Sequence, residues 1–418
     1  MSLNKIPFPL SIDAAGWHFY LLSTTAFLLG FSFPTSNFLM NLSLGMVVIC
    51  LLWKPDFGYL LPLLRHPLVW LPAVMFMLLA LSLLTQHHDY GAKMVSKYKK
   101  LLFVLPLALF FLKQPHLVSR VISGFLLANA VILLLSFCVG ISHISLLGID
   151  PENPTVFKLH ITQNVFMAFA ALFWLARTFS AVGWQRWGYC LLVILAVANI
   201  LLMVQGRTGY IALFVGVGSW LLLALSCRMR MVAVAGGILV LLVMILVPNR
   251  ASDRFALGIQ EIKQCLQAPT ERQHQACDNS MGQRLSFARE SFRLIKQAPL
   301  LGNGAGSFWY GNQTTGYSIN NPHNEYLLQT VHSGLLGLVL FLGWMLCCFR
   351  AGWRQAQTCR NLLIAVLTSY MACHLFNSFL LDSSEGHLFV VIAAMLAAAS
   401  LKQKQAQNSG DSKMEQQR

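Results

Sequence analysis

The sequence predicts an all-α polytopic membrane protein, and three features of its composition lead to that fold class. Of its 418 residues, 56% are hydrophobic and only 11% are charged, and the mean hydropathy is +0.61. A soluble domain carries about 25% charged residues, and a water-soluble chain of this length could not bury so much apolar surface. The composition therefore excludes a soluble enzyme with a single anchor. It also excludes a nucleic-acid binder despite the net charge of +15, because positive charge in a membrane protein is first a topology signal.

Twelve apolar segments predict about twelve transmembrane helices, since a span needs about 20 mostly apolar residues. They lie at 16–33, 37–53, 67–85, 100–113, 117–139, 161–178, 187–204, 209–227, 231–247, 324–346, 361–381 and 386–401. Residues 1–248 thus hold the first nine helices, 249–322 form a long outer loop, and 323–401 hold the last three. The tail at 402–418 is rich in Gln, Lys and Ser, and we expect it to be disordered and cytoplasmic.

Positive charges support a cytoplasmic N-terminus. With that orientation every short cytoplasmic connection carries Lys or Arg, as the positive-inside rule expects. The outer positive charges gather in segment 86–100, at Arg207 and in loop 249–322. The lysines of segment 86–100 are Lys93, Lys97, Lys99 and Lys100. A cluster on the disfavoured side needs a separate reason, and an anionic ligand on the outer side is the simplest one.

The outer loop at 249–322 is the longest connection in the chain, and a loop of this length is usually functional. A helix is predicted to begin near Ser280, where Ser280 and Gln283 fit a capping box. Its apolar face would hold Leu285, Ala288, Phe292 and Ile295, and its basic residues are Arg284, Arg289, Arg293 and Lys296. Two interpretations stay open: an amphipathic helix on the bilayer with solvated charges, or a basic stripe that faces phosphates.

Two cysteines lie in the same loop. Cys265 and Cys277 are the members of the ten cysteines that stand in a long polar segment. They can form a disulfide if the loop faces an oxidising compartment.

Besides the basic helix, a second candidate for ligand binding is Arg207. It lies in the segment Gly206-Arg207-Thr208-Gly209, which interrupts an apolar run. An arginine this close to the membrane is costly and indicates function, and its forked donors suit phosphate oxygens. The flanking glycines would allow a tight reversal and close approach of a ligand. The alternative is an arginine that snorkels to the interface and caps carbonyls. No acid nearby in the sequence would pair with it.

A third candidate is His323, which follows Pro322 at the start of the tenth predicted span. Histidine titrates near neutrality and suits general-base catalysis. The alternative is a capping histidine at the interface. His332, nine residues further on, is expected to be buried and to serve packing.

Other polar segments carry weaker signals. The glycine-rich segment 301–307 lacks the strand and βαβ unit of a dinucleotide fold, so it favours a flexible hinge or a lining of the site. His160 enters the sixth span from outside and could line a cavity or be plain interfacial polarity. The fifteen acids are scattered and no metal-binding motif is present, which favours a metal-free mechanism without a cofactor.

At these residues the sequence resembles the O-antigen ligase family of bacterial inner membranes. The resemblance covers most of the chain, because the twelve-span plan and the long loop before the tenth span agree as well. It rests on Gly206-Arg207-Thr208-Gly209, on Arg284 in the basic helix, and on segments 299–304, 322–327 and 334–337.

The resemblance implies a GT-C-like glycosyltransferase of the Gram-negative inner membrane with its site facing the periplasm. Such enzymes transfer a glycan from undecaprenyl diphosphate to the terminal sugar of lipid A–core, without metal and with inversion. Arg207 and Arg284 would then bind the diphosphate, and His323 would deprotonate the acceptor hydroxyl. The residues expected to steer or bind substrate are Arg289, Arg293, Asn324, Lys97, Lys99, Lys100 and His160. Donor, acceptor and membrane lipids are the expected partners.

Alternatives of two classes remain. Within the superfamily, an O-antigen polymerase or a protein O-oligosaccharyltransferase has the same chemistry, although the short polar tail favours the ligase over the protein transferase. The other class is a transporter of an anionic solute. Transporters favour ionisable groups deep within spans, whereas the candidates here lie at the outer edge.

Overall fold

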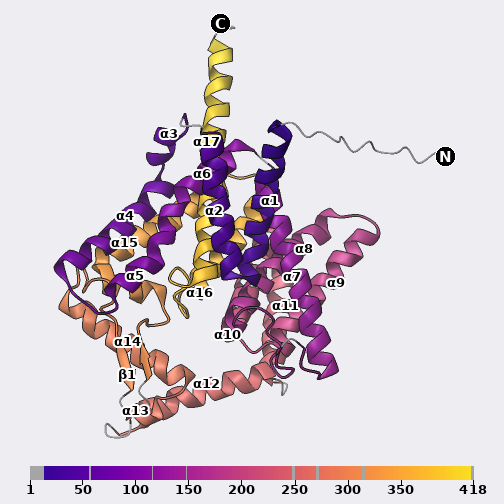
Figure 1. Cartoon of the computed structure of the whole chain (residues 1–418). Helices are drawn as coiled ribbons and strands as arrows, with labels where there is room; N and C mark the ends of the chain where they lie inside the picture. The colour runs from indigo at the N-terminus through magenta and orange to yellow at the C-terminus, as the bar shows by residue number, and fades with distance from the viewer. Residues whose placement is uncertain are drawn as a thin grey trace.

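Helices form almost all of the structure, a computed structural model that describes residues 14–55, 58–114, 116–146, 148–246, 250–269, 273–312 and 317–415. The one sheet among these residues is an antiparallel hairpin of β1 (Tyr310–Asn312) and β2 (Tyr317–Ile319), in which Gly311 lies opposite Ser318. The elements of the predicted outer loop lie at one end of the helical bundle, and the C-terminal end of α17 extends from the other (Figure 1).

Each of the twelve predicted spans contains helix, although the eleventh, predicted at 361–381, ends as a helix at Cys373 and continues as turns. The corresponding elements are α1 (Ala14–Thr35), α2 (Asn37–Trp53), α4 (Pro67–Thr85), η1 (Lys99–Phe103) with α6 (Val104–Lys113), α7 (Leu117–Ser142), α8 (His160–Ser180), α9 (Trp184–Ala198) with η2 (Asn199–Met203), α10 (Arg207–Ala224), α11 (Cys227–Leu246), α15 (Glu325–Trp353), α16 (Gln357–Cys373) and α17 (Ser383–Glu415). The short helices α3 (Leu60–Leu64) and α5 (Gly91–Tyr98) flank α4.

Six of these helical segments are long and apolar enough to cross a membrane. They are Pro67–Thr85, Leu117–Ser142, Trp184–Met203, Arg207–Ala224, Glu325–Trp353 and Ser383–Gln407. The chain is therefore a polytopic membrane protein, as its composition predicts. The count of twelve spans stays a prediction.

Glycines bring α1 and α7 into close contact. A Cβ atom at Gly30 would lie 1.9 Å from the carbonyl oxygen of Val121, and one at Gly124 would lie 2.1 Å from that of Phe27. Helices in membranes associate through small residues that let their backbones approach. These two glycines therefore fix how the first helix packs on the bundle.

The helix α15 is broken near its outer end. Ser333 and Gly334 leave the helical conformation, and Gly334 has a φ of 62°. A break inside a membrane segment leaves backbone groups that must find other partners. Here the carbonyls of Val331 and His332 accept hydrogen bonds from the backbone of the glycine-rich segment, at 2.8 and 3.0 Å.

The glycine-rich segment is thus a hydrogen-bonded partner of the broken helix, and its predicted role as a flexible hinge or a lining of the site stays a prediction. Its residues Gly302, Gly304 and Gly306 all have φ near 80°, which residues with a side chain rarely adopt. A Cβ atom at Gly302 would also lie 2.5 Å from the nitrogen of Gly334. Both constraints come from contacts between distant segments.

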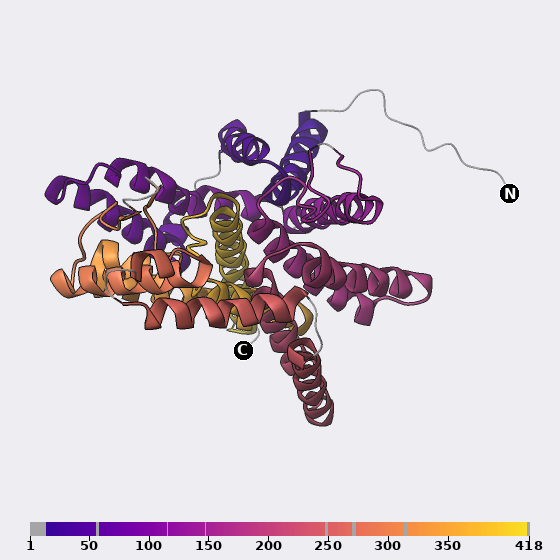
Figure 2. The same ribbon diagram turned by 90° about the horizontal axis from the view of Figure 1, so that it is seen from below.

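The outer loop contains two long helices, where the sequence predicts one. They are α12 (Arg250–Gln267) and α14 (Ser280–Gln297), joined through α13 (Gln273–Ala276). The two helices lie side by side across the end of the bundle (Figure 2). The missed helix α12 carries a residue of the candidate site, described below.

The predicted start of α14 is confirmed, but its cap and buried face differ from the prediction. Asn279 is the N-cap, and its side-chain oxygen accepts a hydrogen bond from the Gly282 nitrogen at 2.8 Å. The helix buries Phe287 and Leu294 against Phe308 and the broken end of α15, whereas Phe292 is 57% exposed. Contacts within the protein therefore determine the face that the structure buries.

The two loop cysteines form a disulfide, with Cα atoms 4.5 Å apart. The bond connects the end of α12 to the turn before α14. Replacing both Cys265 and Cys277 with Ala should lower the free energy of unfolding of this segment by about 2–4 kcal/mol, because the short loop gains freedom when unfolded. Limited proteolysis should then cleave residues 268–280 faster than in wild type. Cys138→Ala, which removes an exposed free thiol, is the control, and equal cleavage rates would contradict a stabilising role.

The helix α17 continues to Glu415, so most of the tail predicted as disordered is helical. Gln, Lys and Ala are good helix formers, and they extend a helix that membrane packing has already nucleated. Residues 416–418 lie outside the described part of the chain.

Candidate functional site

The backbone around Arg207 is held by helix α8 and by the turn between α16 and α17. Arg207 is the first residue of α10, and Asn377 donates a 2.6 Å hydrogen bond to the hydroxyl of Thr208. A Cβ atom at Gly209 would lie 2.3 Å from the Cβ of Asn164 on α8. The glycines beside Arg207 therefore permit close helix packing, not the close approach of a ligand that the sequence suggests.

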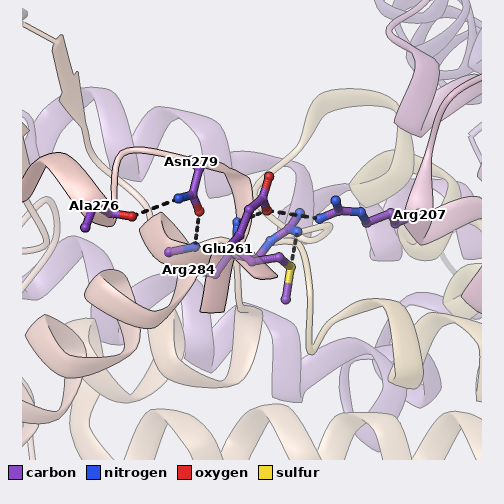
Figure 3. Close-up of polar contacts among 7 residues, drawn as sticks. Arg207, Glu261, Ala276, Asn279 and Arg284 are labelled. Carbon is purple, nitrogen blue, oxygen red and sulfur yellow. Dashed lines mark hydrogen bonds and ion pairs between the residues drawn. The ribbon is translucent and has the colours of Figure 1, made fainter. Parts of the chain in front are cut away.

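Arg207 has an acidic partner that is distant in the sequence, where no nearby acid was found. One of its guanidinium nitrogens lies 3.7 Å from a carboxylate oxygen of Glu261 (Figure 3). The same oxygen accepts a 3.1 Å hydrogen bond from the Met281 backbone nitrogen. Glu261 stands 54 positions away on α12, so no sequence-local pattern could reveal the pair.

The second predicted arginine joins the same group. Arg284 lies in the first turns of α14, largely buried, with its guanidinium 3.6 Å from the sulfur of Met281. Burial lowers the pKa of Arg284, the charge of Arg207 lowers it further, and Glu261 acts in the opposite direction. Two guanidinium groups thus lie near one carboxylate, which pairs with Arg207. The surplus positive charge makes this an anion-binding arrangement.

Glu261 competes with an incoming anion for Arg207. Glu261→Gln removes the carboxylate charge but keeps an oxygen to accept from Met281. The KM for an anionic donor should fall about two- to five-fold, since a partly exposed ion pair of this kind is worth about 1 kcal/mol or less. Steady-state kinetics with varied donor concentration measures the change. Glu290→Gln, which breaks a surface pair with Arg293 instead, should leave the donor KM unchanged, and a raised KM in Glu261→Gln would contradict competition.

His323 lies just before the N-cap of α15 in an unusual backbone conformation. Its φ is 50°, in the left-handed region that few residues other than glycine adopt. Its backbone nitrogen donates a 2.6 Å hydrogen bond to the side-chain oxygen of Asn321, which also accepts from the Ser378 hydroxyl at 3.0 Å. Strain of this kind is typical of functional sites.

The imidazole of His323 lies next to the arginine group. Its ring centroid is 5.9 Å from that of Phe287, which stands one turn after Arg284 on α14. Burial lowers the pKa of His323 to about 4, and the positive charge of Arg284 contributes in the same direction. The imidazole is therefore neutral at pH 7 and available to accept a proton.

The lowered pKa predicts an acid-tolerant pH profile. The neutral form of His323 should persist as the pH falls from 6.5, the ordinary value, to about 4. The acidic limb of kcat/KM, which reports groups of the free enzyme, should therefore lie near pH 4. If the acidic limb of kcat/KM lies at pH 6.5 and disappears when His323 is replaced, the pKa of His323 is not lowered. That result would contradict a buried His323 that faces Arg284.

Two further basic residues of α14 face solvent. Arg289 is exposed, and Arg293 donates to both carboxylate oxygens of Glu290 at 2.9 and 2.6 Å. Neither has a recorded contact with the Arg207–Glu261–Arg284 group. They belong to the outer surface beside it.

The three predicted lysines differ in their surroundings. Lys97 and Lys99 are exposed, and the Lys97 ammonium lies 5.5 Å from the ring centre of Tyr90. Lys100 is only 2% exposed and donates to the carbonyls of Leu381 and Asp382 in the turn between α16 and α17. Its described contacts are thus structural.

Asn324 and His160 each lie at the start of a helix. The Asn324 side chain caps α15 by accepting from the Leu327 nitrogen at 3.0 Å, and it donates to the Leu375 carbonyl at 3.0 Å. The recorded polar contacts of this amide therefore position the helix that follows His323. His160 is half-exposed at the first position of α8, and His332 is buried at 1% exposure, as expected.

Sequence reasoning missed Glu325, the first residue of α15. This fully buried carboxylate accepts hydrogen bonds from the Tyr98 hydroxyl at 2.7 Å and from Gln329 at 2.8 Å. Its other oxygen accepts from the backbone nitrogens of Leu380 and Leu381. Its position in the sequence, as an acid at the edge of an apolar run, could have indicated a functional or structural role. The network anchors the helix start that carries His323.

Within the described ranges, no three or more His, Cys, Asp or Glu side chains come together in a way that could hold a metal ion. The metal-free mechanism stays a prediction.

The comparisons with known proteins bear on the segment that contains these residues. No curated protein matches the chain. Residues 190–342, less than half of the chain, match the family model described as O-Antigen ligase. The matched segment includes Arg207, Arg284 and His323, so it confirms the resemblance where the candidate site lies and indicates a glycan-transferring membrane enzyme.

Proposed function

We propose that the protein is an O-antigen ligase of the Gram-negative inner membrane, with its site facing the periplasm. It transfers a glycan from undecaprenyl diphosphate to the terminal sugar of lipid A–core, with inversion and without metal. One observation carries the proposal: Arg207 pairs with Glu261 near Arg284 of a second helix, and His323 lies close enough to Arg284 to feel its charge. Such a group can hold a diphosphate and deprotonate a hydroxyl in one place.

The arginines serve the leaving group. When the bond between the anomeric carbon and the diphosphate breaks, its electron pair stays on the phosphate oxygen. Fixed guanidinium groups in a partly buried site stabilise that developing charge. Glu261 leaves Arg207 when the diphosphate enters, because the diphosphate carries more negative charge and more acceptor oxygens than one carboxylate.

His323 serves the nucleophile. Its neutral imidazole accepts the proton of the acceptor hydroxyl while the oxygen attacks the anomeric carbon. The diphosphate also offsets the charge of Arg284, which raises the pKa of His323 and makes it a stronger base once the donor is bound. The base is therefore strengthened by the substrate that it needs.

The donor's isoprenoid chain has a suitable place beside Arg207. A cavity of about 260 Å³ lies between η2, the start of α10 and α12, and most of its lining is apolar. Its lining includes Leu202, Tyr210 and Leu257. We assign the isoprene units nearest the diphosphate to this cavity.

The exposed cations guide the acceptor. Lys97, Lys99 and Arg289 lie on the outer surface, and lipid A–core is anionic. Surface charges of this kind raise association rates and are screened by salt. Lys100 and Asn324 contribute by holding the turns and helix start around the site.

The acceptor test separates the ligase from its alternatives. Purified wild-type protein is given undecaprenyl-diphosphate glycan with and without lipid A–core, in the presence of a chelator. Glycan on the core supports the ligase. Longer lipid-linked glycan without use of the core would mean a polymerase, glycan on an added periplasmic protein would mean a protein O-oligosaccharyltransferase, and no transfer at all would favour the transporter.

A further inference from the structure

A second, larger cavity lies within the helical bundle, bounded by α7, α8, α16 and α17. Its volume is about 540 Å³, and its lining is mostly aliphatic and aromatic. Phe125, Phe169 and Leu388 are among the lining residues. It shares no lining residue with the cavity beside Arg207.

The cavity leads away from the candidate glycan-transfer site. Asn164 on α8 packs against Gly209 beside Arg207, whereas Arg177 on the same helix lies at the cavity. Thirteen residues of helix separate them, which is about 20 Å along the axis. The polar end of the cavity is therefore at the opposite face of the bundle, which the positive-inside rule assigns to the cytoplasm.

The polar lining residues gather near the far ends of α8 and α16. They are Arg177, Ser180, Gln355 and Thr358, and no acid lines the cavity. Arg177 is exposed, and its guanidinium has no recorded ion pair or hydrogen bond with any residue that the structure describes. A long apolar chamber with one unneutralised cation at its mouth complements an anionic amphiphile.

The length of the cavity fits one leaflet of a bilayer. Its lining runs from Phe169 to Ser180 on α8 and from Leu388 to Ala399 on α17. Each stretch is about 16 Å of helix, close to half of the roughly 30 Å hydrocarbon core. An acyl chain whose headgroup stays at the membrane surface would therefore end inside the cavity.

We propose that this cavity binds an acyl chain of an anionic glycerophospholipid from the cytoplasmic leaflet, with the lipid phosphate at Arg177. The site is separate from glycan transfer and does not depend on the proposed function. It differs from the donor site because the donor's diphosphate would lie at Arg207, at the other face of the bundle. The bound lipid fills a chamber whose apolar lining side chains on four helices would otherwise have no packing partner across it.

Lipid binding to the purified full-length protein tests the proposal. After delipidation, native mass spectrometry measures the affinities of phosphatidylglycerol and phosphatidylcholine with identical acyl chains. Wild type should prefer phosphatidylglycerol about five-fold, the value of one Arg contact with an anionic surface. Arg177→Gln should abolish the preference. Arg186→Gln, which alters an exposed arginine on the neighbouring α9 outside the cavity, should retain it.

A second variant tests the apolar chamber independently of the charge. Ile392→Trp places a larger side chain at a half-buried lining position, so it should weaken binding of both lipids while the elution volume stays that of wild type. Equal affinities in wild type, or a preference that survives Arg177→Gln, would overturn the proposal. Complete displacement of phosphatidylglycerol by undecaprenyl phosphate would also overturn it, because the occupant would then be a polyprenyl chain.

Discussion

His323→Ala should reduce the rate of glycan transfer about 10²- to 10⁴-fold, the usual contribution of a general base. The donor KM should change little, since Arg207 and Arg284 keep the diphosphate. Single-turnover assays with saturating donor and acceptor measure the effect. A second variant, His323→Asn, should lose activity equally, and it tolerates the left-handed backbone better because Asn adopts that conformation more readily than Ala.

A matched control exists elsewhere in the chain. His143 is also left-handed, with a φ of 54°, and it is exposed at the C-terminal end of α7. His143→Ala imposes a similar backbone change outside the site and should leave transfer intact. If both histidine variants lost activity together, or if His323→Asn remained active, His323 would not be the base.

Arg284→Ala and Arg207→Ala should each reduce kcat/KM about 10²- to 10³-fold, because each removes a fixed donor to the leaving phosphate. Arg284→Lys should recover part of the loss, since lysine restores the charge without the forked geometry. The double variant should lose less than the product of the single effects, because the two arginines act on one group.

The control for the arginines is Lys296→Ala, which removes an exposed charge from the same helix as Arg284. It should retain transfer. If the arginine variants fold, bind the donor normally and transfer the glycan at the wild-type rate, then Arg207 and Arg284 do not bind the diphosphate.

Much of the fold follows from local sequence, whereas the site depends on contacts between distant segments. The apolar runs predict the positions of the membrane helices. The lipid interior offers no hydrogen-bond partners, so each segment must satisfy its own backbone hydrogen bonds. The break at Ser333 and Gly334 could not be predicted, because the groups that stabilise it come from the glycine-rich segment. The prediction of the buried face of α14 was wrong for the same reason. That face packs against Phe308 and Val331, which are distant in the sequence.

The site residues divide in the same way. Arg207 and Arg284 could be found because basic groups on the side predicted to be outer conflict with ordinary charge placement. His323 could be found because it follows Pro322 at a predicted helix start and suits general-base catalysis. Glu261 could not, because it pairs with Arg207 only after α12 folds across the bundle (Figures 2 and 3). The packing role of the glycines beside Arg207 could not be predicted either, since it depends on Asn164 of another helix.

The most direct test of the central claim measures donor binding and transfer in the same preparations. Wild type, His323→Ala and Arg284→Ala are purified and supplied with undecaprenyl-diphosphate glycan and lipid A–core, with chelator present. The account predicts that His323→Ala binds the donor like wild type but does not transfer it, and that Arg284→Ala is weak in both. Transfer by His323→Ala at the wild-type rate, or undiminished donor binding by Arg284→Ala, would contradict it.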